Sequence, residues 1–423
     1  MDAIRIYGGG CLDGQTRIQG SKNAALPILA ATLLINGICE IENCPDISDG
    51  YHMQRLLQSI GCHIRRRDNR LEIDTRQVMT NEMPADSVGV MRSSIMLLGA
   101  MIARTGKVWM EYPGGCVIGA RPINLHLEGL RRMGVTIREE KTGFEASCDR
   151  LQGAEHRLPF VSVGATENLI LAAVLAEGVT TIEPAAREPE IQALCEFLCL
   201  AGARIKGTGS KRLVIKGVKT LHPVSYRIPA DRIVAGTYLA ACLSAGGHIF
   251  LKEAPAGQMQ AVLEKASCMG AAIEVTGEGM EIVCKEKPKN LPYLATACYP
   301  GFPTDLQSPF LSAMAVARGT GVIEEKVFEN RFRTVEELRK MGAQITVTGK
   351  MATVTGVRQL KGTRVCAREL RGGAALVVAG AAAEAEGITT IENKHYIDRG
   401  YEDIVTDMRN LGVKIERVNE ACE

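Results

Sequence analysis

Apolar and small residues along the chain follow a pattern that recurs about every seventy residues. In each recurrence a run with helical spacing of apolar positions ends at a glycine, and an isoleucine follows three residues later. These glycines lie 73, 68, 68, 72 and 70 residues apart. They are Gly61, Gly134, Gly202, Gly270, Gly342 and Gly412. Because glycine adopts the left-handed conformation without steric cost, each is predicted to end a helix just before a strand.

A second landmark precedes each of these glycines. It is an Ala/Leu-rich run that closes at another glycine and leads into a short β-type segment such as GVTTIEP or GITTIEN. The closing glycines are Gly37, Gly106, Gly178, Gly247, Gly321 and Gly387. Each unit therefore reads as strand, helix, strand, helix, strand, strand, and six of them fill the chain. One such unit cannot bury its own apolar faces, so we expect an α/β fold in which three units pack their helices inward in each of two domains.

Composition narrows the classes of function. A chain of 423 residues exceeds one hydrophobic core, which favours two domains. Lys+Arg number 50 against 48 Asp+Glu, so neither a nucleic-acid partner nor a membrane surface is indicated. The 14 cysteines show no CxxC pair or ligand spacing, and we expect them to be reduced, with no metal or other cofactor. The longest apolar run, residues 372–383, is too short to cross a bilayer, and the chain opens without a leader-like segment, so a cytoplasmic protein is expected.

The starts of the Ala/Leu-rich helices carry the first candidate chemistry. Helix N-termini present unpaired N–H groups and a partial positive charge, and therefore favour anions. Polar or charged residues stand at matched positions of the six starts: Lys22, Arg92, Thr166, Asp231, Asp305 and Arg371. Asp305 fits two interpretations, a helix N-cap or a general base held among cations. The pattern alone does not choose between them.

A glycine-rich loop, PGGCVIGARP at residues 113–122, carries the second candidate chemistry. It holds Cys116 among three glycines and places Arg121 close by, which describes a flexible loop suited to closing over an anion. A thiol in such surroundings suits either proton donation or covalent attack, whereas an isolated cysteine is more often a small buried hydrophobe. Further charges precede the second helices, including Arg331 and Arg399, and each could equally be a solvated cap.

Six segments together resemble the enolpyruvyl transferase family, in its branch that acts on UDP-N-acetylglucosamine: GSKNAALPILAATLL, PGGCVIGARP, SVGATEN, FPTDLQ, VFENRF and HYIDRGYE. The resemblance runs from about residue 3 to residue 418. It implies six βαβαββ repeats arranged as a two-domain inside-out α/β barrel, three per domain. The implied domains are residues 22–229, with the cysteine lid at 113–122, and residues 1–21 plus 230–423, with Asp305, Arg331, Arg371 and Arg399.

The resemblance also implies an activity, in which the enolpyruvyl group of phosphoenolpyruvate moves to the 3′-hydroxyl of UDP-N-acetylglucosamine and phosphate leaves. Asp305 would be the base, and Cys116 the acid and the site that fosfomycin alkylates. Lys22, Arg92, Arg121 and Arg399 would bind phosphate, Arg331 and Arg371 the carboxylate, and Asn23 the sugar hydroxyl or the adduct. The nucleotide and sugar would lie along Arg121, Pro122, Ile123, Asn124, Leu125, Val161, Ser162, Val163, Gly164 and Val327.

Three positions depart from the family pattern. Glu369 stands where Asp is usual, so a carboxylate near Lys22 would reach one methylene further; Asn124 replaces a common Asp in the nucleotide loop; and Val234 replaces a frequent Glu. Two alternatives remain. The shikimate-pathway enolpyruvyl transferase shares the repeats but is disfavoured by the cysteine lid and nucleotide loop, and a non-catalytic or weakly active paralogue would bind the same ligands.

Overall fold

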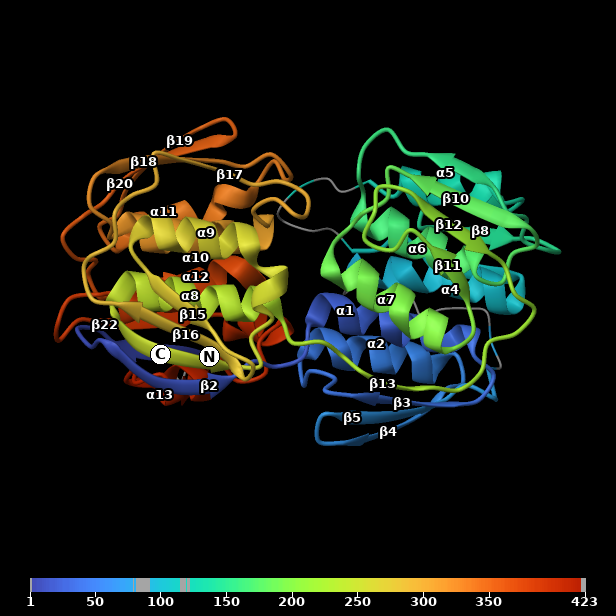
Figure 1. The fold of residues 1–423 in the computed structure, drawn as a ribbon, viewed down its shortest axis with the longest axis horizontal. Helices are drawn as coiled ribbons and strands as arrows, with labels where there is room; N and C mark the ends of the chain where they lie inside the picture. Colours follow the sequence, from blue (N-terminus) through green and yellow to red (C-terminus); the bar gives the residue numbers. More distant parts are fainter. Residues whose placement is uncertain (1, 79, 81–91, 115–118, 120–121, 420–423) are drawn as a thin grey trace. The chain divides into compact units, whose positions relative to one another are not determined.

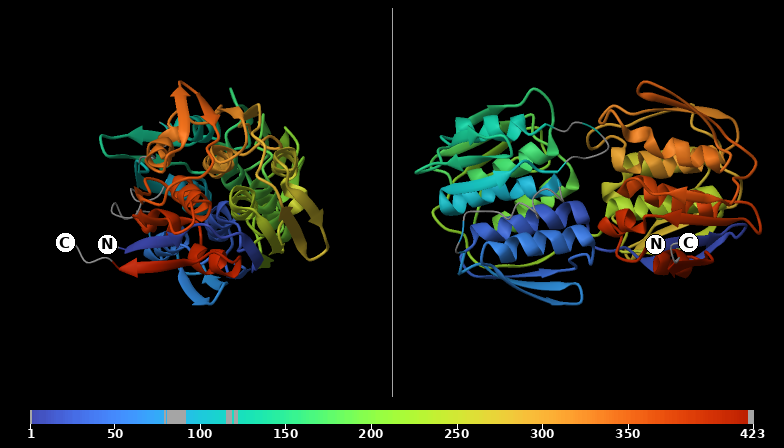
Figure 2. Two further views of the ribbon diagram at one scale, coloured as in Figure 1. Left: turned by 90° about the vertical axis from the view of Figure 1, so that its left-hand side faces the viewer. Right: turned by 180° about the vertical axis from the view of Figure 1, so that it is seen from behind.

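A computed structural model describes residues 2–78, 80, 92–114, 119 and 122–419 of the chain. These residues divide into two compact units, each with its own core. The terminal unit contains residues up to Gln19 and from Ala230 onward, and the central unit contains most of the chain from Gly20 to Pro229. Figure 1 and Figure 2 show helices between sheets within each unit. No described helix is long and apolar enough to cross a membrane.

The described strands form small mixed sheets. The central unit contains β3 (Ile38–Glu42), β4 (His63–Arg67), β5 (Arg70–Asp74) and β13 (Ser225–Arg227); β6 (Lys107–Glu111), β7 (Thr136–Glu139) and β8 (Gly143–Ser147); and β9 (Glu155–Arg157), β10 (Val179–Glu183), β11 (Arg204–Lys206) and β12 (Leu213–Lys216). The terminal unit contains β1 (Asp2–Tyr7), β21 (Arg364–Cys366), β22 (Ile388–Glu392) and β23 (Ile415–Asn419); β2 (Leu12–Arg17), β14 (Gly247–Lys252), β15 (Ala272–Val275) and β16 (Gly279–Cys284); and β17 (Tyr293–Ala295), β18 (Thr320–Glu324), β19 (Gln344–Thr348) and β20 (Met351–Thr355).

The helices alternate with these strands along the chain. The central unit contains α1 (Lys22–Ala31), α2 (Ser48–Ser59), α4 (Met96–Thr105), α5 (Asn124–Arg132), α6 (Val163–Ala173) and α7 (Pro189–Leu200), with short 3₁₀ turns η1 (Thr32–Leu34) and η2 (Arg92–Ile95). The terminal unit contains α8 (Arg232–Ala245), α9 (Gln260–Met269), α10 (Gln307–Ala315), α11 (Thr334–Lys340), α12 (Leu370–Ala381) and α13 (Ile404–Asn410), with η3 (Ala256–Gln258), η4 (Thr304–Leu306), η5 (Arg331–Arg333) and η6 (Lys394–Arg399).

One strand order recurs among the sheets. In each four-stranded sheet one edge pair is parallel and the other neighbours are antiparallel, as in β17-β18-β20-β19. The described part of the sheet β6-β8-β7 has the antiparallel pairs of the same order. Each sheet is open, and the described strands do not close into a barrel. The predicted α/β class is therefore confirmed, whereas the expected barrel is not observed among the described strands.

Two strands are exchanged where the chain passes between the units. β2 precedes α1 of the central unit but pairs in parallel with β14 of the terminal unit. β13 precedes α8 of the terminal unit but pairs in parallel with β3 of the central unit. In addition, β1 lies between β22 and β23, so the start of the chain completes a sheet built from its end. Each of these pairings joins segments far apart in sequence.

The core of the terminal unit forms around α8, α10 and α12, which pack against one another. Every residue of α12 (LRGGAALVVAGA) is buried, so this helix is covered on all sides. Small residues permit this close approach: a Cβ at Gly373 would lie 2.6 Å from Cγ1 of Ile397. The strands bury alternate residues, as in β20 with its exposed-buried-exposed-buried pattern, so one face of the sheet covers the helices. Each fully buried Leu or Ile contributes about 1.5–3 kcal/mol relative to exposure.

The glycine prediction divides into a confirmed part and a corrected part. All six glycines of the first landmark have positive φ, from 89° at Gly342 to 113° at Gly270, which confirms left-handed residues after the helices. The glycines of the second landmark were predicted to close the Ala/Leu-rich helices, but several of these helices end before their glycine. α10 ends at Ala315 and α12 at Ala381, whereas Gly321 already lies inside β18. The residues between each of these helices and the next strand, 316–319 and 382–387, form a short loop instead.

Candidate active site

Three charged side chains meet beside the starts of α10 and α12 in the terminal unit. Asp305 lies in η4, directly before α10; Arg331 begins η5; and Arg371 lies in the first turn of α12. The Nη2 atom of Arg331 donates to Oδ1 of Asp305 at 2.8 Å, and Nη2 of Arg371 donates to Oδ2 at 3.0 Å. One carboxylate is thus held by two guanidinium groups. The structure therefore brings together three residues that lie 26 and 66 positions apart in sequence.

The two arginines are unusually buried for charged residues. Their side chains are 2% and 3% exposed, against 25% for Asp305. The Nε atoms of both guanidinium groups are buried, and neither has a hydrogen-bond partner among the described atoms. Buried donors are usually satisfied, so these two Nε–H groups would each gain from an additional acceptor at this cluster. A substrate carboxylate has the oxygen atoms and the charge to supply one.

Aromatic and hydroxyl groups fix Arg371 from the other side. Its guanidinium lies 5.7 Å from the ring centroid of Tyr401, and Nη1 is 3.5 Å from the hydroxyl of that residue. The Tyr401 hydroxyl in turn shares a hydrogen bond of 2.8 Å with Oγ1 of Thr237 on α8. Burial alone lowers the pKa of Arg371, but Asp305, Tyr401 and Asp231 outweigh it, and the pKa is raised above its usual value. Arg371 is therefore a fixed cation.

Two further carboxylates at this end of the unit cap helices. Glu369 accepts hydrogen bonds from the backbone N–H groups of Arg371 and Gly372, so the carboxylate whose extra methylene was expected to reach toward Lys22 caps α12. Asp231 caps α8 by accepting from the N–H groups of Ile233 and Val234 at 2.7 and 3.1 Å. Asp305, by contrast, does not occupy an N-cap position, which belongs to Pro303 for η4 and to Leu306 for α10. Of the two interpretations left open by the sequence, the N-cap is thus excluded.

The apolar departure at Val234 has a structural explanation. Its side chain is fully buried within α8, in the core cluster of the terminal unit. Val327, expected near the sugar, is 38% exposed. Arg399 ends η6 and is half-buried. Arg399, Val327 and Asp305 lie in the terminal unit.

Sequence reasoning missed Glu325, a buried carboxylate next to this cluster. It follows β18, is 1% exposed, and accepts hydrogen bonds from the backbone N–H groups of Val327 and Phe328 at 2.8 and 3.1 Å. It also accepts from the hydroxyls of Thr296 and Thr304 at 2.8 and 2.9 Å. A glutamate after a strand usually faces solvent, so nothing in the sequence pattern signalled this burial.

In the central unit, Lys22 is the first residue of α1, after the N-cap Ser21. Its ammonium group lies 2.7 Å from Oδ2 of Asp49, in the first turn of α2, and both side chains are largely buried. Asn23 follows on the same turn and is half-buried. Asp49 was also missed by sequence reasoning, because its place in ISDGY is that of an ordinary first-turn acid. Asp49 thus fixes the ammonium group of Lys22 at the start of α1.

The two segments expected to hold the nucleotide lie against each other in the central unit. Residues 122–125 enter α5 and residues 161–164 enter α6, and these two helices are in contact. A Cβ on Gly164 would lie 3.2 Å from Cε1 of His126, a tight contact that favours a residue without a side chain there. His126 is fixed by Asn168, whose amide nitrogen is 3.0 Å from Nδ1. Asn124 begins α5 and is exposed.

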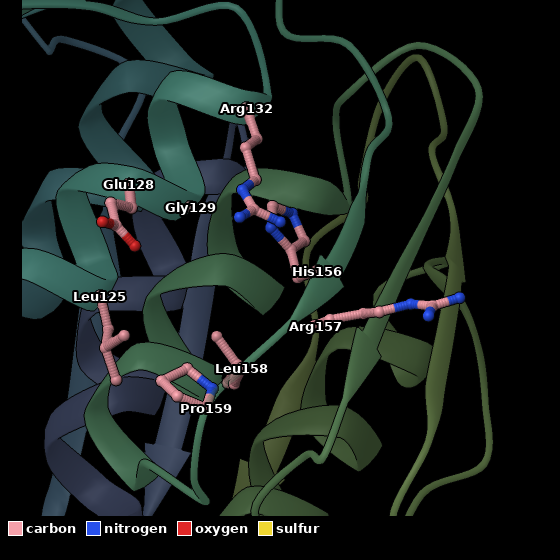
Figure 3. A pocket seen from close by; sticks show the side chains of 8 residues that line it. All are labelled: Leu125, Glu128, Gly129, Arg132, His156, Arg157, Leu158 and Pro159. Carbon is pink, nitrogen blue, oxygen red and sulfur yellow. The ribbon is translucent and has the colours of Figure 1, made fainter.

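A surface pocket opens beside this segment (Figure 3). Its lining residues are Leu125, Glu128, Gly129, Arg132, His156, Arg157, Leu158 and Pro159. In Figure 3 the Arg132 guanidinium lies next to the His156 ring. Burial and the nearby Arg132 lower the pKa of His156 to about 4, so this imidazole is neutral near pH 7. Leu125 is the one residue of this lining that belongs to the predicted site residues described by the structure.

Some of the predicted residues fall outside the described part of the chain. Cys116 and Arg121 of the glycine-rich loop are among them, and for Arg92 the structure describes the backbone at the start of η2 only. Among the described site residues, Asp305, Arg331 and Arg371 form one contacting cluster, whereas Lys22 and the two nucleotide segments belong to the central unit.

Comparison with known proteins places this arrangement in a family. Residues 6–408 match the family model described as EPSP synthase (3-phosphoshikimate 1-carboxyvinyltransferase). The chain is 43% identical over 418 residues to UDP-N-acetylglucosamine 1-carboxyvinyltransferase 2 of Caldanaerobacter subterraneus subsp. tengcongensis, covering 99% of this chain and 100% of that protein. It is 45% identical over 421 residues to UDP-N-acetylglucosamine 1-carboxyvinyltransferase of Saccharophagus degradans, with the same coverage.

Solved structures agree with the sequence comparisons. The enolpyruvyl transferase NikO from Streptomyces tendae superimposes with a TM-score of 0.87 at 26% identity, covering 99% of both chains. EPSP synthase from Acinetobacter baumannii matches with a TM-score of 0.75 at 18% identity, covering 99% of this chain and 100% of that chain, a likeness of fold alone. With full-length relatives above 40% identity and a family model that spans nearly the whole sequence, this chain belongs to the enolpyruvyl transferase family.

Proposed function

We propose that this chain transfers the enolpyruvyl group of phosphoenolpyruvate to the 3′-hydroxyl of UDP-N-acetylglucosamine with release of phosphate, the first committed step of peptidoglycan synthesis. The printed names of relatives at 43% and 45% identity support this acceptor. The observation that carries the chemistry is the carboxylate of Asp305 held by two buried arginines whose Nε–H groups have no acceptor among the described atoms. The cytoplasmic location expected from the sequence stays a prediction.

In this proposal Asp305 takes the proton from the 3′-hydroxyl as its oxygen attacks C2 of phosphoenolpyruvate. Contact with two cations favours the ionised carboxylate, and each oxygen keeps a second lone pair to accept that proton. Cys116 donates a proton to the C3 methylene, which becomes a methyl group in a tetrahedral adduct. The Cys116 thiolate then takes a proton back from this methyl group, and phosphate leaves C2 and carries away the proton that Asp305 had accepted, which restores the double bond. Phosphate is the only group lost in the net reaction, so no redox partner is required.

The anionic groups of the substrates are assigned to cations. Arg331 and Arg371 would bind the carboxylate, because their buried guanidinium groups match a planar two-oxygen partner. The phosphate would be bound by Lys22, Arg92, Arg121 and Arg399. Preorganised charges of this kind stabilise the charge that develops during the reaction.

The acceptor would lie mainly against the central unit. Asn23 would contact the sugar hydroxyl or the adduct, and Val327 of the terminal unit would lie near the sugar. The nucleotide would follow residues 121–125 and 161–164, where the entrances to α5 and α6 are in contact. Closure of the 113–122 loop would exclude water and bring Cys116 to the reacting carbon.

The finer architecture is part of the same proposal. We infer six βαβαββ repeats, three in a lobe of residues 22–229 and three in a lobe of residues 1–21 plus 230–423. The recurring strand order, with its one parallel and two antiparallel pairings, supports this division. The exchange of β2 and β13 is the expected result of a chain that starts in one lobe, enters the other and returns.

The test is phosphate release from phosphoenolpyruvate by the purified chain, with UDP-N-acetylglucosamine or with shikimate 3-phosphate as acceptor. Release with the UDP-sugar alone supports the proposal. Release with shikimate 3-phosphate alone would assign the chain to the shikimate pathway. No release with either acceptor, together with UDP-N-acetylglucosamine binding in a calorimeter, would identify a non-catalytic paralogue.

A further inference from the structure

Glu325 joins two segments that carry different charged groups of the candidate site. Its Oε2 atom accepts the hydroxyl of Thr304, which begins η4 and directly precedes Asp305. Its Oε1 atom accepts the N–H groups of Val327 and Phe328, in the loop that leads to Arg331. One buried carboxylate therefore links the segment that precedes Asp305 to the segment that precedes Arg331.

Neighbouring contacts make this connection stiff. The hydroxyl of Thr296, directly after β17, donates to the same Oε1 atom and accepts the N–H of Lys326 at 2.9 Å. The ring of Phe328 lies under the Arg331 guanidinium, 5.8 Å from ring centroid to Cζ. A shift of the 326–328 turn would therefore move the surface on which Arg331 rests. A shift of Thr304 would move the adjacent Asp305.

The residue type also matters. A glutamate can accept four hydrogen bonds at two oxygens, and here it receives two backbone N–H groups and two hydroxyls. Burying a carboxylate is costly unless such donors satisfy it, and an apolar residue would leave all four donors without this acceptor. A glutamine would keep Oε1 as an acceptor, and its amide could donate to the Thr304 hydroxyl, which is able to accept. The network therefore requires a polar residue of this length.

We propose that Glu325 is a positioning residue for the transfer reaction: it holds η4 and the 326–331 loop so that Asp305 and Arg331 meet in the reactive geometry. This inference rests on the proposed function, because its main readout is turnover. It predicts that loosening the link to η4 impairs the chemical step more than substrate binding. A misplacement of about 1 Å can cost two orders of magnitude in rate.

Thr304→Val tests the link with a change of nearly equal volume that removes only the hydroxyl. The matched control is Thr32→Val in the central unit, where a buried threonine hydroxyl donates to the carbonyl of Leu29 at 2.7 Å. We expect Thr304→Val to lower kcat about tenfold or more, with KM for both substrates within about threefold of wild type. The control should lose a similar amount of thermal stability and keep its kcat. Glu325→Gln should restore most of the kcat that Glu325→Ala loses.

Equal kcat values for the two valine variants would overturn the inference. So would a Glu325→Gln enzyme as impaired as Glu325→Ala, or losses of kcat that follow the melting temperature across all four variants. Failure of the proposed function would look different, because the wild-type chain itself would then release no phosphate with UDP-N-acetylglucosamine. In that case the inference falls together with the function on which it rests.

Discussion

Replacing Asp305 with asparagine exchanges one carboxylate oxygen for an NH₂ group. It thereby removes a negative charge that contacts both Arg331 and Arg371. In the wild-type chain the two carboxylate oxygens accept from the two Nη2 atoms at 2.8 and 3.0 Å. Asparagine keeps the shape but offers one oxygen and one NH₂ group. One guanidinium would therefore face another donor, and both buried cations would lose their shared counter-charge.

The cost can be bounded from burial. Removing one partner of a fully buried ion pair costs about 3–5 kcal/mol, whereas an exposed pair contributes about 0–1 kcal/mol. The arginine side chains are 2% and 3% exposed, but Asp305 is 25% exposed and partly solvated. We therefore expect Asp305→Asn to lower the free energy of unfolding by about 1–3 kcal/mol. A matched control is Glu253→Gln, opposite Arg17, where both side chains are 45% exposed and the loss should stay below about 1 kcal/mol.

Urea unfolding followed by circular dichroism measures both variants, and phosphate release measures activity. Loss of a general base lowers kcat by about 10²–10⁴-fold. Asp305→Asn should therefore be slightly less stable and nearly inactive, whereas Glu253→Gln should resemble wild type in both. An Asp305→Asn variant as stable as wild type would show that the arginines do not depend on this charge. Wild-type kcat in that variant would exclude Asp305 as the base.

Three other predictions concern separate parts of the chain. Asp49→Asn removes the carboxylate that orients Lys22. Because a misplaced Lys22 would lose its charge-assisted contact with the phosphate, KM for phosphoenolpyruvate should rise about tenfold in steady-state assays. An unchanged KM would show that Lys22 does not bind the phosphate. Fosfomycin should add its mass once to the wild-type chain and not to Cys116→Ser in intact mass spectra; equal labelling of both would place the reactive thiol elsewhere. The pKa of His156 is lowered to about 4, below its unfolded value of about 6.5. As the pH falls, the unfolded state therefore binds this proton first, and the free energy of unfolding should decrease between about pH 6.5 and pH 4. In urea unfolding at several pH values, His156→Gln should lose less of its free energy of unfolding over this window.

The sequence predicted what depends on local backbone chemistry. The six helix-ending glycines were identifiable because a left-handed residue after a helix is a local requirement, and all six have positive φ. Apolar helix runs were visible for the same reason, although their ends were placed too late where the glycine belongs to the next strand. The partners of β2 and β13 could not be read from the residue pattern, because strand pairing between segments far apart in sequence leaves no local pattern.

Charged residues were harder to interpret from sequence. Asp231, Glu369 and Asp305 all stand near helix starts, yet the first two cap helices and the third pairs with two arginines. A carboxylate before a helix can do either, and the choice depends on which cations the fold brings to it. Glu325 and Asp49 were missed because their burial is decided by tertiary packing.

The most direct measurement is identification of the product formed when the purified chain is incubated with phosphoenolpyruvate and UDP-N-acetylglucosamine. We expect nuclear magnetic resonance to show an enolpyruvyl ether on O3 of the sugar and one phosphate released for each ether formed. Unchanged substrates, an ether at another oxygen, or phosphate released without an ether would contradict the function proposed for this chain.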